Sequence, residues 1–141
     1  MKATESKKLR EETAREEAGR AAVELVDNWH DAWPRVLAAI DRFGDRKSIL
    51  VDADGWLSAR QNLLVAFENR RVAGYIVFRV QPATGKRKAG EACVEARLDS
   101  AAVDMPYKSR GIEKILCDAA LARARELKCT DVKGLEASAW C

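Results

Sequence analysis

Apolar residues in the first third of the chain recur every three or four positions, which is the period of an amphipathic helix. The first twenty residues are strongly charged, and we expect them to form a helix that is either a solvated face or a dimerisation arm. Pro34 cannot sit inside a helix without a kink, so the pattern predicts two helices that divide there, the second ending at Gly44. The apolar stripe consists of Ala18, Ala21, Ala22, Leu25, Trp29, Trp33, Val36, Leu37 and Ile40. We expect both tryptophans of this stripe to pack against a sheet.

Stretches rich in β-branched and aromatic residues predict strands in the middle of the chain. Residues 48–53 predict a short strand, and residues 62–80 predict a hairpin that turns at Asn69-Arg70-Arg71. Gly74 lies inside the second strand of this hairpin, where a glycine indicates a bulge or a close approach of another backbone segment. Residues 81–90 form a loop whose Lys86-Arg87-Lys88 tip is either simply solvated or attracts a phosphate-bearing ligand.

The last third of the chain predicts a strand, a long helix and a final strand. Residues 91–103 read as the first strand, residues 111–128 as an amphipathic helix and residues 132–140 as the last strand. Such a unit implies a parallel pair of strands with a right-handed crossover.

The alternation along residues 91–103 predicts one charged face. Strict alternation places Cys93, Glu95, Arg97, Asp99 and Ala101 on one side, and Val94, Ala96, Leu98 and Ser100 on the other. Two carboxylates on one strand face can serve as general bases. They can equally form ion pairs with Arg97 or with Arg79 of a neighbouring strand, and both interpretations stay open at this point.

Composition and length indicate one globular domain. The chain has 141 residues, of which 48% are hydrophobic and 33% charged, and we expect a single domain over residues 1–141. This domain divides into a helical segment, 1–47, and a sheet with a long helix, 48–141. A net charge of +3 is too mild to predict nucleic-acid binding. With no apolar run near the ~18 residues of a membrane span and no secretion signal, we expect no membrane association and a cytoplasmic location.

The spacing of cysteine and histidine residues predicts no metal site. The four cysteines, at positions 93, 117, 129 and 141, form no C-x-x-C pair, and His30 is the single histidine. We interpret Cys93 and Cys117 as small, reduced core residues, and His30 as a surface or boundary residue.

The turn before the long helix has the chemistry of an anion site. Lys108, Ser109, Arg110 and Gly111 join a strand to a helix N-terminus, where free backbone N–H groups and the helix dipole favour a phosphate. Arginine can hold phosphate through two parallel hydrogen bonds. The alternative is a purely structural turn, since a short glycine-containing turn is a weak motif.

With these residues in view, residues 98–112, LDSAAVDMPYKSRGI, resemble the GNAT superfamily of acyl-CoA N-acyltransferases. In that family a strand ends in an "AV" pair, and a Q/R-x-x-G-x-G/A loop opens the helix. The resemblance implies that the backbone of Ala102 and Val103 binds pantetheine in the gap between two splayed strands. It implies that the amides of the loop hold the pyrophosphate of acetyl-CoA or CoA, with Lys108 at the Q/R position, Ser109 and Arg110 at the variable positions and Gly111 at the first glycine. Glu95 or Asp99 would be the base that acts on the substrate amine.

The resemblance therefore implies an α/β (α+β) fold, with a GNAT-like mixed sheet, N-terminal helices and a helix crossover between the last two strands. Two departures stand out: Glu113 occupies the second small position of the loop, and the family's last helix, last two strands and first strand are not recognised. We read this as a GNAT-like chain truncated at its C-terminus, and expect a homodimer that covers the open sheet edge. Two functions stay open: an acetyl-CoA-dependent N-acetyltransferase acting on a small-molecule or protein amine, and a non-catalytic dimeric module that binds CoA or a protein partner.

Overall fold

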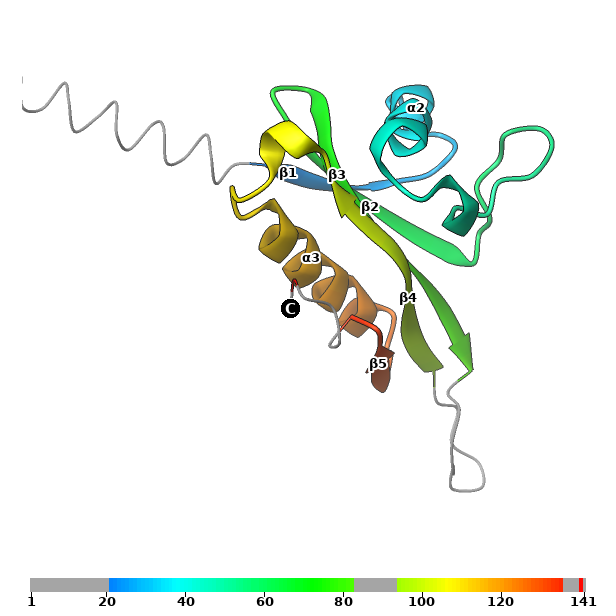
Figure 1. Ribbon diagram of the computed structural model, residues 1–141. Helices are drawn as coiled ribbons and strands as arrows, with labels where there is room; N and C mark the ends of the chain where they lie inside the picture. Colours follow the sequence, from blue (N-terminus) through cyan, green and yellow to red (C-terminus); the bar gives the residue numbers. More distant parts are fainter. Residues whose placement is uncertain (1–20, 83–93, 136–139, 141) are drawn as a thin grey trace, which may run out of the picture.

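Five strands form one mixed sheet in the order β1-β2-β3-β4-β5, with one helix on each face (Figure 1). The structure is a computed structural model that describes residues 21–82, 94–135 and 140. Neighbouring strands are antiparallel except β4 and β5, which are parallel and are joined through the helix α3. This arrangement confirms the predicted mixed sheet and helix crossover. The elements are β1 (Ala22–Val26), α2 (Trp33–Phe43), β2 (Gln61–Glu68), β3 (Arg71–Pro82), β4 (Val94–Val103), α3 (Ile112–Glu126) and β5 (Asp131–Lys133), with short 3-10 helices η1 (Arg46–Ser48) and η2 (Met105–Tyr107).

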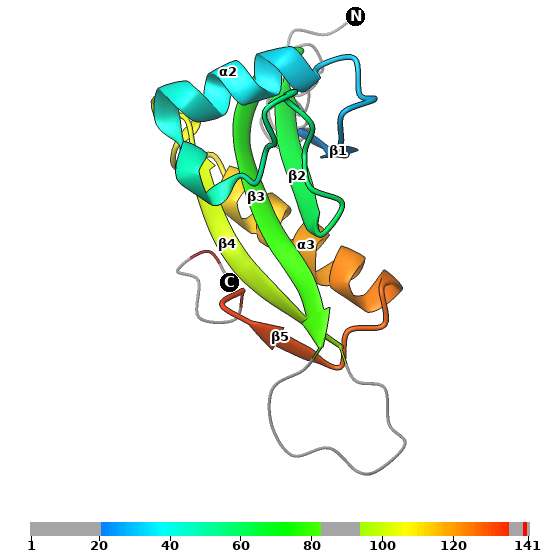
Figure 2. The same ribbon diagram turned by 90° about the vertical axis from the view of Figure 1, so that its right-hand side faces the viewer.

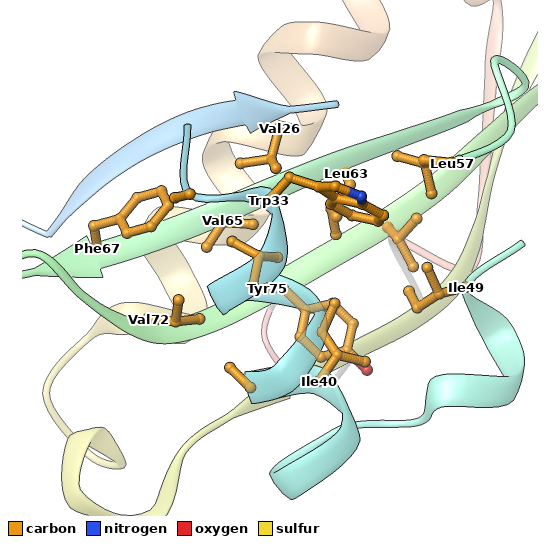
Figure 3. Packing of buried hydrophobic residues seen from close by; sticks show 14 residues of the cluster. Val26, Trp33, Ile40, Ile49, Leu57, Leu63, Val65, Phe67, Val72 and Tyr75 are labelled. Carbon is orange, nitrogen blue, oxygen red and sulfur yellow. The ribbon is translucent and has the colours of Figure 1, made fainter. Parts of the chain in front are cut away.

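The helix α2 buries its apolar side on one face of the sheet (Figures 2 and 3). Pro34 lies in the first turn of α2, where its missing N–H costs no hydrogen bond, so the proline starts the helix. Trp33 is buried and its indole N–H donates to the Gly55 carbonyl at 3.1 Å, which confirms the predicted packing of this residue. Tyr75 is fully buried in the apolar cluster between α2 and the sheet, and its hydroxyl accepts from the Asp45 backbone N–H at 2.8 Å.

The helix α3 covers the opposite face and packs mainly on β3 and β2, with a smaller contact to β4 (Figure 1). Gly74 of β3 lies opposite Ala66, next to an irregularity in the pairing of β2 with β3. A Cβ atom at Gly74 would lie 2.8 Å from the Ala102 carbonyl oxygen and 3.2 Å from a methyl group of Leu116. The predicted close approach at Gly74 is therefore confirmed.

The N-terminal segment differs from the prediction. The prediction of a helix through residues 21–32 is wrong, because Ala22–Val26 form β1, which pairs antiparallel to β2. The apolar residues in this stretch fit the helical period, and the pairing with β2 overrides that local pattern. The structure thus has a strand ahead of α2, although none was recognised from the sequence, and residues 1–47 are not all helical. The charged residues 1–20 lie outside the described part of the chain.

Trp29 was also predicted wrongly. Its side chain is 79% exposed and meets the ring of Trp56 edge-on, with 5.2 Å between the ring centroids. Since β1 ends at Val26, Trp29 lies in the loop before α2 and not on a continuous helical stripe.

Two other strand predictions differ from the structure. Residues 48–53 hold only the last residue of η1 and an isolated bridge between Val51 and Leu57, so the strand predicted there is wrong. Buried Gln61 holds this loop through hydrogen bonds to the Leu50 N–H and the Ser48 carbonyl, both 2.7 Å long. The strand predicted over residues 132–140 is β5, three residues long, and residues 136–139 lie outside the described part.

Candidate active site

A bulge in β4 sets the direction of the side chains around the candidate site. Ser100 pairs with Val77 and Leu98 pairs with Phe78, so Asp99 is the extra residue between them. Asp99 accepts a hydrogen bond from Gln61 at 2.9 Å, and the Ser100 and Tyr75 hydroxyls lie 2.8 Å apart. The side chains of Asp99 and Ser100 therefore both point to the face of the sheet that α2 covers.

The bulge corrects the predicted alternation. Ala101 packs against the core under α3, and Ala102 against the core under α2. The prediction that Ala101 shares a face with Asp99, and that Ser100 faces the other way, is wrong because one extra residue reverses the alternation.

The last part of β4 leaves an open strand edge. The pairing with β5 comprises Glu95 with Asp131, Ala96 with Val132 and Arg97 with Lys133. Beyond Arg97, no strand of the described part pairs with this edge of β4, which continues to Val103. Ala102 and Val103 lie in this unpaired part. Successive residues of a strand point their backbone groups to opposite sides, and Asp104 donates its N–H to Ala73 of β3 while the Ala102 carbonyl lies against Gly74, so Val103 presents its N–H and C=O to the free edge.

The two candidate carboxylates have different surroundings. Asp99 accepts from Arg79 Nε at 2.8 Å through one oxygen and from Gln61 Nε2 at 2.9 Å through the other, and its side chain is 11% exposed. The expected cross-strand ion pair with Arg79 is thus present. Glu95 is fully buried: one carboxylate oxygen accepts from Gln81 at 2.8 Å, and the other has no hydrogen-bond partner. A base role for either residue stays a prediction.

The turn between β4 and α3 has the backbone geometry of an anion site. Asp104 accepts from the Met105 N–H at 2.9 Å and begins η2, and Ser109 and Gly111 both adopt positive φ angles, 65° and 80°. Gly111 is the N-cap of α3, and the first bond of the helix runs from the Ile115 N–H to the Gly111 carbonyl at 3.2 Å. The backbone N–H groups in the first turn of α3, before Ile115, have no partner among the carbonyls of the helix and are available to a ligand.

The charged side chains of this turn are not equivalent. Lys108 is exposed. The Arg110 guanidinium forms an ion pair with Glu68 at 2.8 Å and lies over the Tyr107 ring, 5.8 Å from its centroid. Arg110 is therefore already engaged at the end of β2. Glu113 lies in the first turn of α3, as predicted, while Lys114 pairs with Asp118 at 3.3 Å.

The surroundings of the cysteine and histidine side chains give little support for a nucleophile or a base among them. Burial raises the pKa of the Cys129 thiol, which keeps it protonated and poorly nucleophilic at neutral pH. Cys117 is buried and disulfide-bonded, so the expectation of a reduced thiol there is wrong. Disulfides are uncommon in cytosolic proteins, so this bond does not support the predicted cytoplasmic location, which stays a prediction. His30 lies near the surface, 3.3 Å from Glu24.

No cluster of three or more histidine, cysteine or acidic side chains in the described part of the chain is arranged to hold a metal ion. Likewise, none of the helices in residues 21–82, 94–135 and 140 has the length and apolar character needed to cross a membrane.

Comparison with known proteins gives the family. The profile of the acetyltransferase (GNAT) family matches residues 22–139. The chain belongs to this family. A search of curated protein sequences found no match.

Solved GNAT structures share the fold. A ribosomal-protein-alanine N-acetyltransferase from Brucella melitensis biovar Abortus 2308 superposes with a TM-score of 0.56 at 16% identity, covering 79% of this chain and 77% of the other. An aminoglycoside acetyltransferase from an uncultured soil metagenomic sample has a TM-score of 0.57 at 16% identity, covering 79% and 74%. The aminoglycoside N-acetyltransferase AAC(6')-Iy, solved in complex with CoA, has a TM-score of 0.53 at 14% identity, covering 79% and 75%. Identities this low establish the fold and leave the substrate open.

Proposed function

We propose that this GNAT protein transfers the acetyl group of acetyl-CoA to the amine of a small molecule or protein. The observation that carries the proposal is the open edge of β4 beyond Arg97, which leads directly into the turn and the N-terminus of α3. A strand edge with free amide groups next to a helix N-terminus offers one continuous path for a ligand with an amide-containing arm and a pyrophosphate.

The donor would lie along that path. The pantetheine arm would lie along Ala102 and Val103 and hydrogen-bond the backbone groups that face the free edge, and the pyrophosphate would meet the N–H groups of the turn from Ser109 to Glu113. Lys108 is exposed and would add a positive charge. Glu113 opposes binding, since two like charges about 4 Å apart repel by ~1 to 4 kcal/mol when partly solvated.

Acyl transfer requires one proton to leave the amine and one to reach the leaving thiolate. The amine nitrogen would attack the thioester carbonyl, the carbon–sulfur bond would break, and the products would be an amide and free CoA thiol. We favour Asp99 as the group that accepts the amine proton, because it lies at the bulge where β4 leaves β5 and keeps partial contact with solvent. Glu95 is the second candidate, because its free oxygen is buried without a hydrogen-bond partner.

The alternative is a non-catalytic GNAT module that binds CoA or a protein partner. It is favoured by the fact that Asp99 uses both carboxylate oxygens in hydrogen bonds within the protein. The two proposals differ in one product, which is free CoA thiol formed in the presence of amines.

The deciding experiment has two stages. Acetyl-CoA is titrated calorimetrically into the purified protein, and into Lys108→Glu and Lys47→Glu variants. We expect micromolar binding that weakens with salt and with Lys108→Glu, and that is unchanged by Lys47→Glu, which lies in η1. Thiol release is then measured with a panel of amines. Binding without thiol release supports the module, and no binding at millimolar ligand contradicts acetyl transfer and a CoA-binding module, which leaves a module that binds a protein partner.

We further propose that two chains pair as a homodimer. In the described part, β1 is an outer strand that pairs only with β2, and its Leu25 side chain is 43% exposed. Sedimentation at micromolar concentration measures the mass directly, and a monomer there contradicts the proposal.

A further inference from the structure

A groove lined by arginines lies between α2, the β2–β3 turn and η2. Its volume is about 610 Å³, within the range of small-molecule sites, about 300–1,000 Å³. Two arginines come from α2, Arg35 and Arg42, and two from the hairpin, Arg70 and Arg71. The opposite wall carries Asp104 and Tyr107, which follow β4.

The positive charge in this groove is mostly uncompensated. Asp104 is the single carboxylate in the lining, and it pairs with Arg42 at 2.8 Å. Four guanidinium groups against one carboxylate leave a formal excess of three positive charges. Among the described residues, no ion pair joins Arg35, Arg70 or Arg71 to an acidic side chain.

One of these arginines also ties the helix to the hairpin. Arg35 donates to the Arg70 backbone carbonyl at 3.1 Å, which ties α2 to the hairpin turn. Arg70 has a φ of 65°, so the turn is tight and its backbone direction is set. Placing these guanidinium groups beside one another costs repulsion that an anionic ligand would relieve.

We propose that this groove binds a phosphate-bearing organic anion of the nucleoside di- or triphosphate class, at a site separate from the acetyl-CoA path. The planar fork of arginine matches phosphate oxygens in pairs, and several forks in one groove favour more than one phosphate. The Val72 side chain and the Tyr107 ring give the organic part of such a ligand an apolar and aromatic wall.

The groove shares one wall with the proposed acetyl-CoA path, since its Asp104 and Tyr107 adjoin the turn before α3, but its arginines come from α2 and the hairpin, which that path does not include. The groove is bordered by β3 and α2, whereas β5 and the open edge lie on the other side of β4. Asp104 follows the bulge at Asp99 by five residues, which is roughly 16 Å along an extended strand. A ligand in the groove would leave the bulge free.

The test is a calorimetric titration of ATP, and separately of inorganic pyrophosphate, into the full chain. The variants are Arg35→Gln, Arg71→Gln and the double variant, and the matched control is Arg125→Gln, an exposed arginine of α3. We expect salt-sensitive ATP binding that falls at least tenfold in the double variant and stays within twofold in the control. Each single variant should lose part of the affinity, so the result does not depend on the double variant folding.

Saturating CoA separates this site from the acetyl-CoA path. We expect unchanged ATP affinity in the presence of saturating CoA. Displacement of ATP by CoA but not by dephospho-CoA would assign the groove to the 3′-phosphate of CoA and overturn the proposal. No ATP binding at millimolar concentration, an equal loss in Arg125→Gln, or tighter binding of a polyglutamate peptide than of ATP would overturn it as well.

Discussion

The guanidinium of Arg110 lies 2.8 Å from the carboxylate of Glu68, and this pair ties the turn before α3 to the end of β2. The second oxygen of Glu68 is buried and has no hydrogen-bond partner. The arginine that the sequence predicted to hold a phosphate is thus paired with an acidic side chain of the neighbouring hairpin, and Glu68 competes with any anion at the turn for Arg110.

Replacing Glu68 with glutamine should increase acetyl-CoA affinity. The substitution removes the competing charge and frees Arg110, which is 48% exposed and can turn toward the ligand. We expect a gain of several-fold in calorimetric titration, consistent with ~1 kcal/mol for one charge-assisted contact. Glu126→Gln is the control, because it breaks a comparable pair with Arg123 at the far end of α3. Unchanged affinity in Glu68→Gln would mean that Arg110 does not reach the donor.

Glu113→Gln should also strengthen binding of the donor. A carboxylate in the first turn of α3 stabilises the helix dipole but repels a pyrophosphate at the same place. We expect acetyl-CoA affinity to rise roughly fivefold, matching ~1 kcal/mol of repulsion relieved, and the free energy of unfolding to fall slightly. Equal affinities at low and high salt in both proteins would contradict a charge effect.

The sequence predicted the mixed sheet and the helix crossover better than the details at the site. The hairpin around Asn69 and Arg70 was recognised because strand propensity and turn residues agree there. The bulge at Asp99 was missed, because LDSAAV alternates acceptably in either register and only the pairing of β3 with β4 reveals the extra residue. Gln61 was missed for a related reason. Its role depends on contacts with Ser48 and Asp99, which are distant in sequence.

Asp99→Asn tests the assignment of the base. Asparagine keeps the size of the side chain but cannot accept a proton, so the rate constant of acetyl transfer should fall by about 10²-fold or more. The dissociation constant of acetyl-CoA should stay within a factor of two, which separates chemistry from donor binding. Asp118→Asn, an exposed change on α3, serves as the control. A full rate in Asp99→Asn combined with a large loss in Glu95→Gln would move the role to Glu95.

Gly74→Ala should strongly destabilise the fold. A Cβ atom there would lie 2.8 Å from the Ala102 carbonyl oxygen, and this contact is to backbone in the neighbouring strand, which cannot move without disturbing the sheet. We expect a loss of about 1–3 kcal/mol in the free energy of unfolding by urea denaturation, the usual cost of overpacking. A loss below about 0.5 kcal/mol would show that β3 and β4 separate easily at this point.

Gly111 allows backbone strain and ligand contact to be measured separately. Its φ is 80°, and no atom lies within 4 Å of the place where a Cβ would stand. Alanine should therefore cost ~1–2 kcal/mol in the free energy of unfolding from conformation alone. Asparagine should cost less, since it tolerates the left-handed region.

Both substitutions at Gly111 fill the open space in which the proposed pyrophosphate would lie. If that space holds the ligand, acetyl-CoA affinity should fall in both variants, and more in the bulkier Gly111→Asn, although that protein is the more stable of the two. If the turn is purely structural, affinity should instead follow stability, with Gly111→Ala the weaker binder.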